Sequence, residues 1–174
     1  TLKRFSTLDG HGLKMLARAG ITPAVITGRD SPALRRRLEA LGVPTMHCAG
    51  WGERGRNPSR RQSFVLTRAL THTVSLEDFC AGWGPRRRWT TQQISLKRQL
   101  LRQLATTARA LHDNGVNHRD FYLCHFLLSQ DSPGLARPGQ ALHLHLIDLH
   151  RTQLRARTPR RWRVKDIAGL YFSA

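Results

Sequence analysis

The sequence predicts a mixed fold of the α+β class, and two observations carry this prediction. Apolar residues recur at helical spacing through residues 91–113, and Asn114 and Gly115 follow as a helix end. Short runs rich in β-branched and apolar residues lie on either side, at 63–70 and 126–129. A chain of 174 residues, 40% of them hydrophobic, can bury a core around these elements.

The remaining elements follow from caps, breakers and periodicity. Ser31 and Pro32 begin a helix that Gly42 ends, and Ser75 caps another helix with two acidic residues in its first turn. We expect helices at 9–19, 31–41, 75–82, 91–113 and from Trp162 or Lys165 to the end. We expect strands at 23–27, 45–51, 63–70, 126–129 and 142–148.

Composition limits the partners and the compartment. A net charge of +18 indicates an anionic partner, such as nucleic acid, nucleotide, phosphosugar or an acidic membrane surface. Cys48, Cys80 and Cys124 lie far apart, which predicts free thiols rather than disulfides or zinc. No apolar run reaches the length of a membrane span, and the first residues lack a secretory signal pattern. We therefore expect a cytoplasmic protein.

The stretch NHRDFYLCHF at 117–126 concentrates polar groups among aromatic and apolar residues. The chain order is a long helix, this polar loop, a short strand, a turn-rich loop and a strand that ends in Asp148. This order resembles the catalytic half of the protein-kinase-like fold, where an H-R-D loop precedes a metal-binding aspartate. Such a site would work by positioning and charge neutralisation, as phosphoryl transfer requires.

Each polar residue of the pattern then has an expected role. Asp120 would orient the acceptor hydroxyl and take its proton, and Asp148 would hold Mg²⁺ against the nucleotide phosphates. His125 occupies the position at which ordinary kinases carry asparagine. Three roles stay open for it: a metal ligand, a holder of a water molecule, or a group that only orients Asp120.

Longer strings narrow the resemblance to one family. NHRDFYLCHFLL at 117–128 and IDLHRTQLRARTPRRWRVKDIAGLYFSA at 147–174 resemble the lipopolysaccharide core heptose kinases, as do GERGRNPSRRQSFVLT and TVSLEDFC upstream. The resemblance covers about residues 43–174. It implies transfer of the γ-phosphate of ATP, with Mg²⁺, to a heptose hydroxyl of the inner core, at the cytoplasmic face of the bacterial inner membrane.

The same resemblance implies roles for individual residues. His118 and Arg119 would shape the loop that carries the catalytic Asp120, and Asp166 would anchor that loop from below. Asp148 and His125 would form the metal site. The strand from Val65 to Leu70 would be the hinge against the adenine, with the nucleotide contacted by Val65, Leu66, Thr67 and Arg68.

The basic run after Asp148 has two interpretations. Arg155, Arg157 and Arg160 could hold the acidic lipopolysaccharide core acceptor or face the inner-membrane surface. The alternative is a solvated face that only keeps the chain soluble. Charge reversal at these three positions would weaken acceptor use far more than ATP use only under the first interpretation.

Residues 1–43 resemble a different family. FSTLDGHGLKMLARAGITPAVITGRDSPALRRRLEALGV is similar to an internal piece of the 3-deoxy-D-manno-octulosonate 8-phosphate phosphatases, of the haloacid-dehalogenase superfamily, in which Thr27 would contact phosphate. The nucleophilic and metal-binding acids of that family are absent, so we expect no phosphatase activity. The predicted fold is therefore a short α/β haloacid-dehalogenase-like fragment at 1–43, followed at 44–174 by an incomplete protein-kinase-like fold with hinge and catalytic core.

Two rival functions remain open, because the strand lysine and glycine-rich loop of kinases have no clear counterpart. Lys3 and Glu39 could mimic the lysine–glutamate pair only by position. A catalytically inactive remnant would bind nucleotide or acidic glycolipid without turnover. A basic nucleic-acid binder, which we do not expect, would bind in a salt-sensitive way without needing Asp120 or Asp148.

We expect His143, His145 and His150 to be surface histidines rather than a metal site.

Overall fold

The computed structural model describes residues 32–54, 62–84, 88–137 and 139–174, and these fall into two compact units. The first contains residues 47–54 and 62–68, and the second contains residues 32–46 and those from 69 onward. The predicted helix at 9–19, the strand at 23–27, Lys3 and Thr27 lie outside the described residues.

The described part of the first unit is a β-hairpin. Strand β1 (Cys48–Arg54) pairs antiparallel with β2 (Gln62–Thr67), and Trp51 lies opposite Val65. The register shifts between Cys48 and Gly50, which marks a bulge. Both strands were predicted, but β1 extends beyond the expected end at residue 51, and β2 stops before residue 70.

A three-stranded antiparallel sheet forms the middle of the second unit, in the order β3-β5-β6. Its strands are β3 (Thr73–Ser75), β5 (Phe126–Ser129) and β6 (Leu144–Leu146). Strand β6 is shorter than the predicted 142–148, although Leu142, Leu144 and Leu146 are buried as the alternation indicated. Thr45 adds a parallel bridge to Leu146 at the edge of this sheet.

Helix α3 (Leu76–Ala81) follows β3 directly, and its cap agrees with the sequence. The Ser75 side chain accepts a hydrogen bond from the Asp78 backbone N–H over 3.0 Å. The short helix α5 (Pro133–Ala136), between β5 and β6, was not predicted, because its Pro-Gly composition is typical of a turn.

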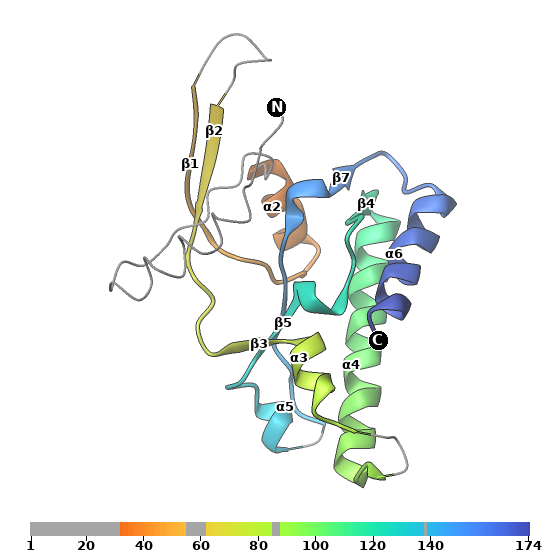
Figure 1. Cartoon of the computed structure of the whole chain (residues 1–174). Helices are drawn as coiled ribbons and strands as arrows, with labels where there is room; N and C mark the ends of the chain where they lie inside the picture. Colours follow the sequence, from red (N-terminus) through yellow and green to blue (C-terminus); the bar gives the residue numbers. More distant parts are fainter. Residues whose placement is uncertain (1–31, 55–61, 85–87, 138) are drawn as a thin grey trace, which may run out of the picture. The chain divides into compact units, whose positions relative to one another are not determined.

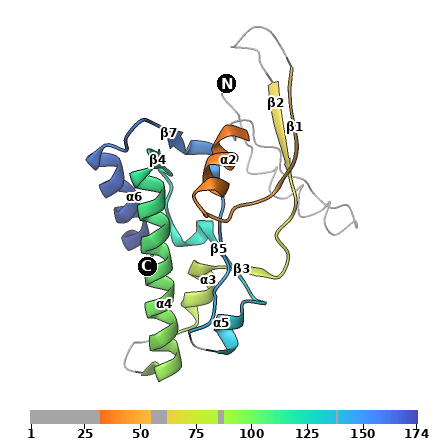
Figure 2. The same ribbon diagram turned by 180° about the vertical axis from the view of Figure 1, so that it is seen from behind.

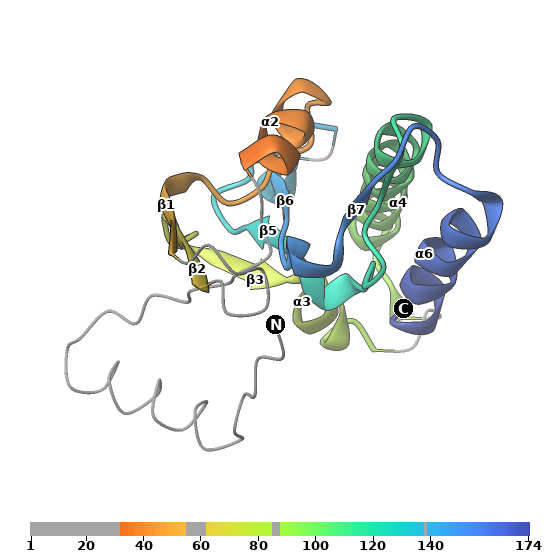
Figure 3. The same ribbon diagram turned by 90° about the horizontal axis from the view of Figure 1, so that it is seen from above.

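Helix α4 (Thr91–Asp113) has the predicted bounds and lies between the β5–β6 strands and α6 (Arg160–Phe172), as Figures 1 and 3 show. Thr90 and Gln93 form a reciprocal capping box at its start. Its buried side chains include Leu100, Leu104 and Leu111, each of which contributes about 1.5–3 kcal/mol by burial. Helix α6 begins at Arg160, earlier than the predicted Trp162 or Lys165.

Helix α2 (Pro32–Ala40) packs within the second unit, since Leu34, Leu38 and the following Val43 are part of its core. Figures 1 and 2 show α2 beside the end of this unit that carries β4 and β7, and Arg37 Nη2 donates to the Asn114 carbonyl over 3.3 Å. A division of the chain at residue 43 stays a prediction. Helix α2 itself confirms the helix expected at 31–41.

Gly115 occupies the tightest turn of the second unit. It connects α4 to β4 (Val116–Asn117), which pairs antiparallel with β7 (Gln153–Leu154). Its φ is +75°, and a Cβ at this position would collide with the Arg155 carbonyl. The Arg155 backbone N–H donates to the Gly115 carbonyl over 2.8 Å, so the two chain segments are held together at this point.

Replacing Gly115 by alanine is therefore expected to lower the free energy of unfolding by about 1–3 kcal/mol or more, from strained backbone and steric overlap together. Urea titration followed by circular dichroism measures the loss. Gly42→Ala is the matched control, because Gly42 has a φ of +65° but open space around the added carbon. Equal losses in both variants would mean that the contact with Arg155 costs nothing.

Within the described residues, no helix combines the length and apolar character needed to cross a bilayer.

Candidate functional site

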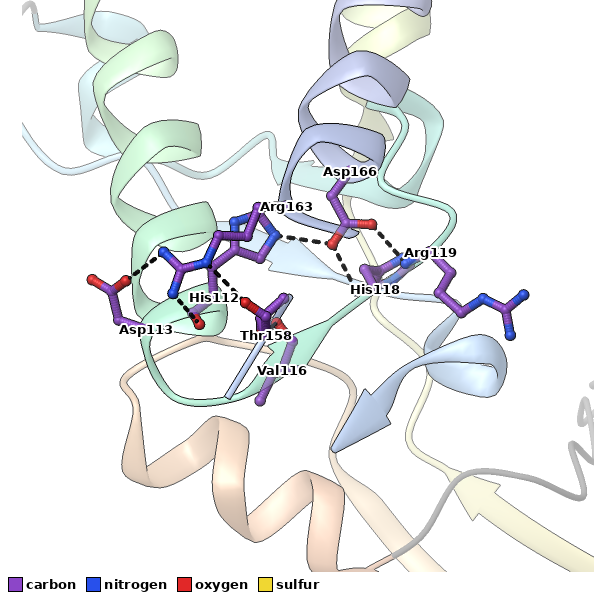
Figure 4. A network of polar contacts seen from close by, with 8 residues as sticks. All are labelled: His112, Asp113, Val116, His118, Arg119, Thr158, Arg163 and Asp166. Atoms are coloured by element: carbon purple, nitrogen blue, oxygen red, sulfur yellow. Dashed lines mark hydrogen bonds and ion pairs between the residues drawn. The ribbon is translucent and has the colours of Figure 1, made fainter. Parts of the chain in front are cut away.

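The loop at residues 117–120 is anchored by a buried carboxylate on α6. Asp166 is completely buried and accepts from the backbone N–H groups of His118, over 2.9 Å, and Arg119, over 2.8 Å. His112, near the end of α4, contacts the same carboxylate through Nε2 over 3.0 Å. Figure 4 shows His112 of α4 and the loop residues His118 and Arg119 around the Asp166 carboxylate of α6. The role suggested for Asp166 by the family resemblance agrees with these contacts.

Arg163 holds the N-terminal part of α6 against the end of α4. Its guanidinium donates to the Asp113 carboxylate over 2.9 Å and to the His112 carbonyl over 3.0 Å. Its Nε donates to the Thr158 carbonyl over 3.3 Å (Figure 4). Thr158 is buried and donates to the Val116 carbonyl over 3.2 Å. These bonds fix the chain between β7 and α6 onto β4.

His118 connects the anchored loop to the segment that carries Asp148. Its Nε2 donates to the Ile147 carbonyl over 2.9 Å, because a carbonyl oxygen can only accept. Its Nδ1 is buried without a partner in the described residues. Burial lowers the pKa of His118 below the ordinary value of 6.5, and the hydrogen bond to Ile147 opposes this only in part. Burial therefore favours the neutral form of this ring.

This lowered pKa predicts a loss of stability in acid. The unfolded chain binds a proton at His118 near pH 6.5 and the folded chain does not, so stability is present above 6.5 and falls as pH drops below it. One such group contributes at most about 1.4 kcal/mol per pH unit. The plot of unfolding free energy against pH should be shallower below pH 6.5 in His118→Gln. The exposed His143→Gln should keep the slope of the unmodified chain, and an identical slope in His118→Gln would contradict the prediction.

His125 links the two carboxylate-bearing residues Asp120 and Asp148. Its Nδ1 lies 2.7 Å from the Asp120 carbonyl, and its Nε2 lies 3.3 Å from Asp148 Oδ2. It belongs to a 3₁₀ turn at Leu123–His125 (η2), which immediately precedes β5 in the sequence. The structure thus brings Asp120, His125 and Asp148 together, while Arg119 and His118 lie in the same loop.

The side chain of Asp120 has a cationic neighbour. Arg151 Nη1 donates to Asp120 Oδ1 over 2.8 Å, and the Asp120 carboxylate is mostly buried. Arg151 ends a second 3₁₀ turn, Leu149–Arg151 (η3), that begins immediately after Asp148. This charge-assisted hydrogen bond holds the carboxylate in one orientation.

Two of the residues in this site adopt left-handed backbone. Among the described residues, the non-glycine residues with positive φ are His72, Arg119 (φ 77°) and Asp148 (φ 59°). Side chains with a Cβ adopt this region at a cost of about 1–3 kcal/mol, and such residues cluster at functional sites. The bonds of Asp166 to the Arg119 N–H and of His118 to the Ile147 carbonyl oppose this cost at both positions.

The Asp148 carboxylate offers the oxygen that a hard cation prefers. Because the Asp120 carbonyl can only accept, Nδ1 of His125 carries a hydrogen, and Nε2 lies 3.3 Å from Asp148 Oδ2. An imidazole nitrogen is a weaker ligand for such an ion than an oxygen. No group of three or more His, Cys, Asp and Glu side chains in the described ranges is already arranged to hold a metal ion. Phosphate and water oxygens would have to complete the site, as is usual for Mg²⁺.

The predicted acceptor arginines lie on the surface of the second unit. Arg155, Arg157 and Arg160 are exposed, and Arg155 donates to Gln153 Oε1 over 2.5 Å. Arg157 and Arg160 line an open pocket of about 550 Å³ together with Thr158, Pro159 and Arg163. No ion pair is recorded for Arg155, Arg157 or Arg160 among the described residues.

The predicted nucleotide hinge belongs to the other unit. Val65, Leu66 and Thr67 lie on β2, and Arg68 follows with its N–H bonded to the His47 carbonyl over 2.9 Å. Glu39 is an exposed residue of α2. The pairing of Glu39 with Lys3 stays a prediction, because Lys3 is outside the described residues.

Sequence reasoning missed three partners of the site. His150 contacts Asp148 through Nδ1 while its side chain stays 41% exposed, so it lies at the surface as expected, and His143 is exposed as well. His145 is only partly exposed, and its Nδ1 is buried. Arg151 was considered only as part of a basic run, and His112 only as part of a helix. The adjacency of His150 and Arg151 to Asp148 was the available signal, but no local pattern indicates the contact of His112 with Asp166.

Comparison with known proteins adds a family to this geometry. The model of the lipopolysaccharide kinase (Kdo/WaaP) family matches residues 27–174. The chain is 48% identical over 154 residues to lipopolysaccharide core heptose(I) kinase WaaP of Escherichia coli. This alignment covers 87% of this chain and 54% of the relative. WaaP of Pseudomonas aeruginosa is 48% identical over 150 residues, 86% of this chain and 53% of the relative.

A solved structure and a second family also match. The structure of WaaP in complex with acyl carrier protein has a TM-score of 0.71 and 46% identity, covering 82% of this chain and 56% of that one. The 3-deoxy-D-manno-octulosonate 8-phosphate phosphatase KdsC of Haemophilus influenzae is 55% identical over only 42 residues, 24% of this chain. The chain spans about half the length of the kinases it matches. The mixed α and β kinase-like fold predicted from the sequence is confirmed by these kinases, whereas the haloacid-dehalogenase-like fragment stays a prediction. On the match of the family model over residues 27–174, the chain belongs to the lipopolysaccharide kinase (Kdo/WaaP) family.

Proposed function

We propose that the chain carries the catalytic core of an ATP-dependent kinase that phosphorylates a heptose hydroxyl of the lipopolysaccharide inner core. The observation that carries this proposal is the bridging position of His125, which contacts the Asp120 backbone carbonyl through one ring nitrogen and the Asp148 carboxylate through the other. Phosphoryl transfer needs the group that activates the alcohol and the group that neutralises phosphate charge to be positioned together, and His125 connects the two segments that carry them.

Asp120 acts as the base in this proposal. It orients the acceptor hydroxyl and takes its proton as the oxygen attacks the γ-phosphorus, and the bond from that phosphorus to the β–γ bridging oxygen breaks. Arg151 holds the carboxylate in position through its 2.8 Å ion pair. His118 and Arg119 position the loop through their contacts with Ile147 and Asp166.

Asp148 and His125 hold the magnesium ion, which supplies charge neutralisation at the β- and γ-phosphates when it is bound. Asp148 would hold the ion through its carboxylate and His125 through its ring nitrogen, and these two groups lie 3.3 Å apart. This assignment selects metal binding from the three roles considered for His125. Val65, Leu66, Thr67 and Arg68 contact the nucleotide, as the resemblance to the kinases implies.

The exposed arginines receive the acidic acceptor. Arg155, Arg157 and Arg160 have no carboxylate partner among the described side chains, so their charge is available to phosphates and carboxylates of the lipopolysaccharide core. The same surface faces anionic lipid at the cytoplasmic side of the inner membrane, where the acceptor is embedded. Nucleic acid is not a partner in this proposal.

An inactive remnant that binds nucleotide is the second candidate. It is favoured by the absence of an assigned counterpart for the strand lysine, since the lysines of the described residues are Lys97 on α4 and Lys165 on α6, and neither lies on a strand. Mg²⁺-ATP binding without turnover would identify this state.

Incubation of the full chain with Mg²⁺-ATP and a heptose-containing core oligosaccharide, followed by mass spectrometry, tests the proposed function. The expected result is a gain of one phosphoryl group on the acceptor that requires both Mg²⁺ and ATP. A chain that binds Mg²⁺-ATP but leaves the acceptor unchanged would overturn the kinase proposal and favour the remnant.

A further inference from the structure

Three cationic side chains converge on one indole ring beside the loop that carries Asp120. The guanidinium of Arg119 lies 5.2 Å from the centroid of the Trp162 ring, and the guanidinium of Arg161 and the ammonium group of Lys165 each lie 5.4 Å from it. The charges of Arg161 and Lys165 are carried by α6, whereas Arg119 comes from the loop anchored by Asp166. Each cation gains attraction from the aromatic face, worth about 0.5–1 kcal/mol at an exposed position.

The three cations also repel one another. Each charge lies within about 11 Å of the other two, which is comparable with the screening length of about 10 Å in 0.1 M salt. Arg161 and Lys165 are also four residues apart on one helix, a spacing at which like charges destabilise. The first turn of α6 contains no acidic residue, so the positive end of the helix dipole adds to the same potential.

No acceptor in the described residues satisfies this cluster. None of Arg119, Arg161 and Lys165 forms an ion pair there. The Nε of Arg119 and the Nε1 of Trp162 are both buried donors without a hydrogen-bond partner. Buried donors are normally satisfied, so two of them on adjoining side chains need an explanation. Figure 4 shows that the Arg119 side chain extends away from Asp166, although its backbone N–H is held by that residue.

We propose that Arg119, Arg161 and Lys165, arranged around Trp162, form a binding site for a phosphate monoester. A phosphate carries a charge of about −1.5 to −2 near neutral pH and offers three oxygens, which suits three converging cations. Guanidinium groups bind such oxygens in pairs, and they do so more specifically than an isolated ammonium group. The phosphate is supplied either by a phosphorylated glycolipid or by free phosphate, which share this chemistry.

The site would couple anion binding to the loop that carries Asp120. Arg119 immediately precedes Asp120 and has left-handed backbone that Asp166 stabilises. Asp166 restrains the backbone of Arg119, and a phosphate that joins the Arg119 guanidinium to α6 would restrain its side chain as well. This coupling rests on the proposed kinase function, whereas phosphate binding by the cluster does not.

Isothermal titration calorimetry with inorganic phosphate, in the absence of ATP and acceptor, tests the site independently of catalysis. We expect saturable binding by the unmodified chain that weakens about tenfold in Arg161→Gln and in Lys165→Gln, because each loses one charge-assisted contact. Both positions are exposed, so these variants are expected to fold. Lys97→Gln is the matched control, since Lys97 also lies over a tryptophan, 4.6 Å from the ring of Trp89, and no other cation of the described residues lies over that ring.

The outcomes separate the site from the proposed function. Unsaturable phosphate binding, or equal weakening by Lys97→Gln, would overturn the site whether or not the chain has kinase activity. Retained phosphate binding in a chain that transfers no phosphate would keep the site and reject the function. Flotation with vesicles that contain phosphorylated or dephosphorylated lipid A identifies the source: preference for the phosphorylated vesicles that Arg161→Gln removes assigns a glycolipid, and no preference assigns free phosphate.

Discussion

Replacing Asp120 by asparagine is expected to lower phosphoryl transfer by a factor of about 10² to 10⁴, the usual contribution of a well-placed general base. Asparagine keeps the size of the side chain but cannot take the proton of the acceptor hydroxyl. The contact of His125 Nδ1 is with the backbone carbonyl of Asp120, so it survives the substitution. The affinity for Mg²⁺-ATP should therefore stay within a few-fold of the unmodified chain. Single-turnover transfer from labelled ATP measures the first quantity, and nucleotide titration measures the second.

Asp131→Asn is the matched control for this experiment. Asp131 is exposed in the turn after β5, and its carboxylate forms no ion pair among the described residues. It should transfer phosphate at the unmodified rate. If Asp120→Asn retained full transfer, Asp120 would not be the base, and the bridging position of His125 would lose its interpretation. If it lost nucleotide binding as strongly as transfer, its role would be structural.

The sequence predicted the elements with strong local signals. Helix α4 was placed with its bounds correct because apolar periodicity and the Asn114–Gly115 stop act within the helix itself. Strands β3, β4 and β7 were missed, since each has only two or three residues and exists through pairing with a distant partner. A strand of that length has no periodicity to detect. Tertiary pairing, not propensity, determines these segments.

The candidate site was predictable in its order along the chain but not in its connections. Asp120, His125 and Asp148 were identified from a loop and a strand end, and the structure brings them together. The ion pair of Arg151 with Asp120 and the contact of His112 with Asp166 join segments 31 and 54 residues apart. Such contacts depend on how α4 and α6 pack, so no short motif reports them.

The basic residues separate into groups that charge counting cannot distinguish. Arg151 and Arg163 are engaged with carboxylates and have structural or positioning roles. Arg157 and Arg160 line an open pocket. Arg161 lies near the Trp162 ring, as do Arg119 and Lys165. A neighbouring carboxylate already balances the charge of an arginine. An arginine without such a neighbour can bind an external anion instead. The partner-free arginines are therefore the ones that point to an acidic ligand.

Replacing Asp166 by alanine is expected to cost about 3–5 kcal/mol of unfolding free energy, the largest loss for a single residue of this site. Asp166 is completely buried and accepts from the N–H groups of His118 and Arg119 and from His112. Its removal leaves three buried donors without an acceptor and frees the left-handed backbone of Arg119. Since domains are commonly stable by only about 5–15 kcal/mol, this loss is a large fraction of the total. Urea titration measures it.

Asp113→Ala separates a buried anchor from a surface ion pair on the same helix interface. The Asp113 side chain is 54% exposed and pairs with Arg163 over 2.9 Å, so its loss should cost no more than about 1 kcal/mol. Asp166→Asn should fall between the two alanine variants, because its amide oxygen still accepts from one backbone N–H while its NH₂ group faces the remaining donors. Equal costs for Asp166→Ala and Asp113→Ala would show that the loop at 117–120 holds its conformation without the buried carboxylate. The geometry around Asp120 would then have to come from His118, His125 and Arg151 alone.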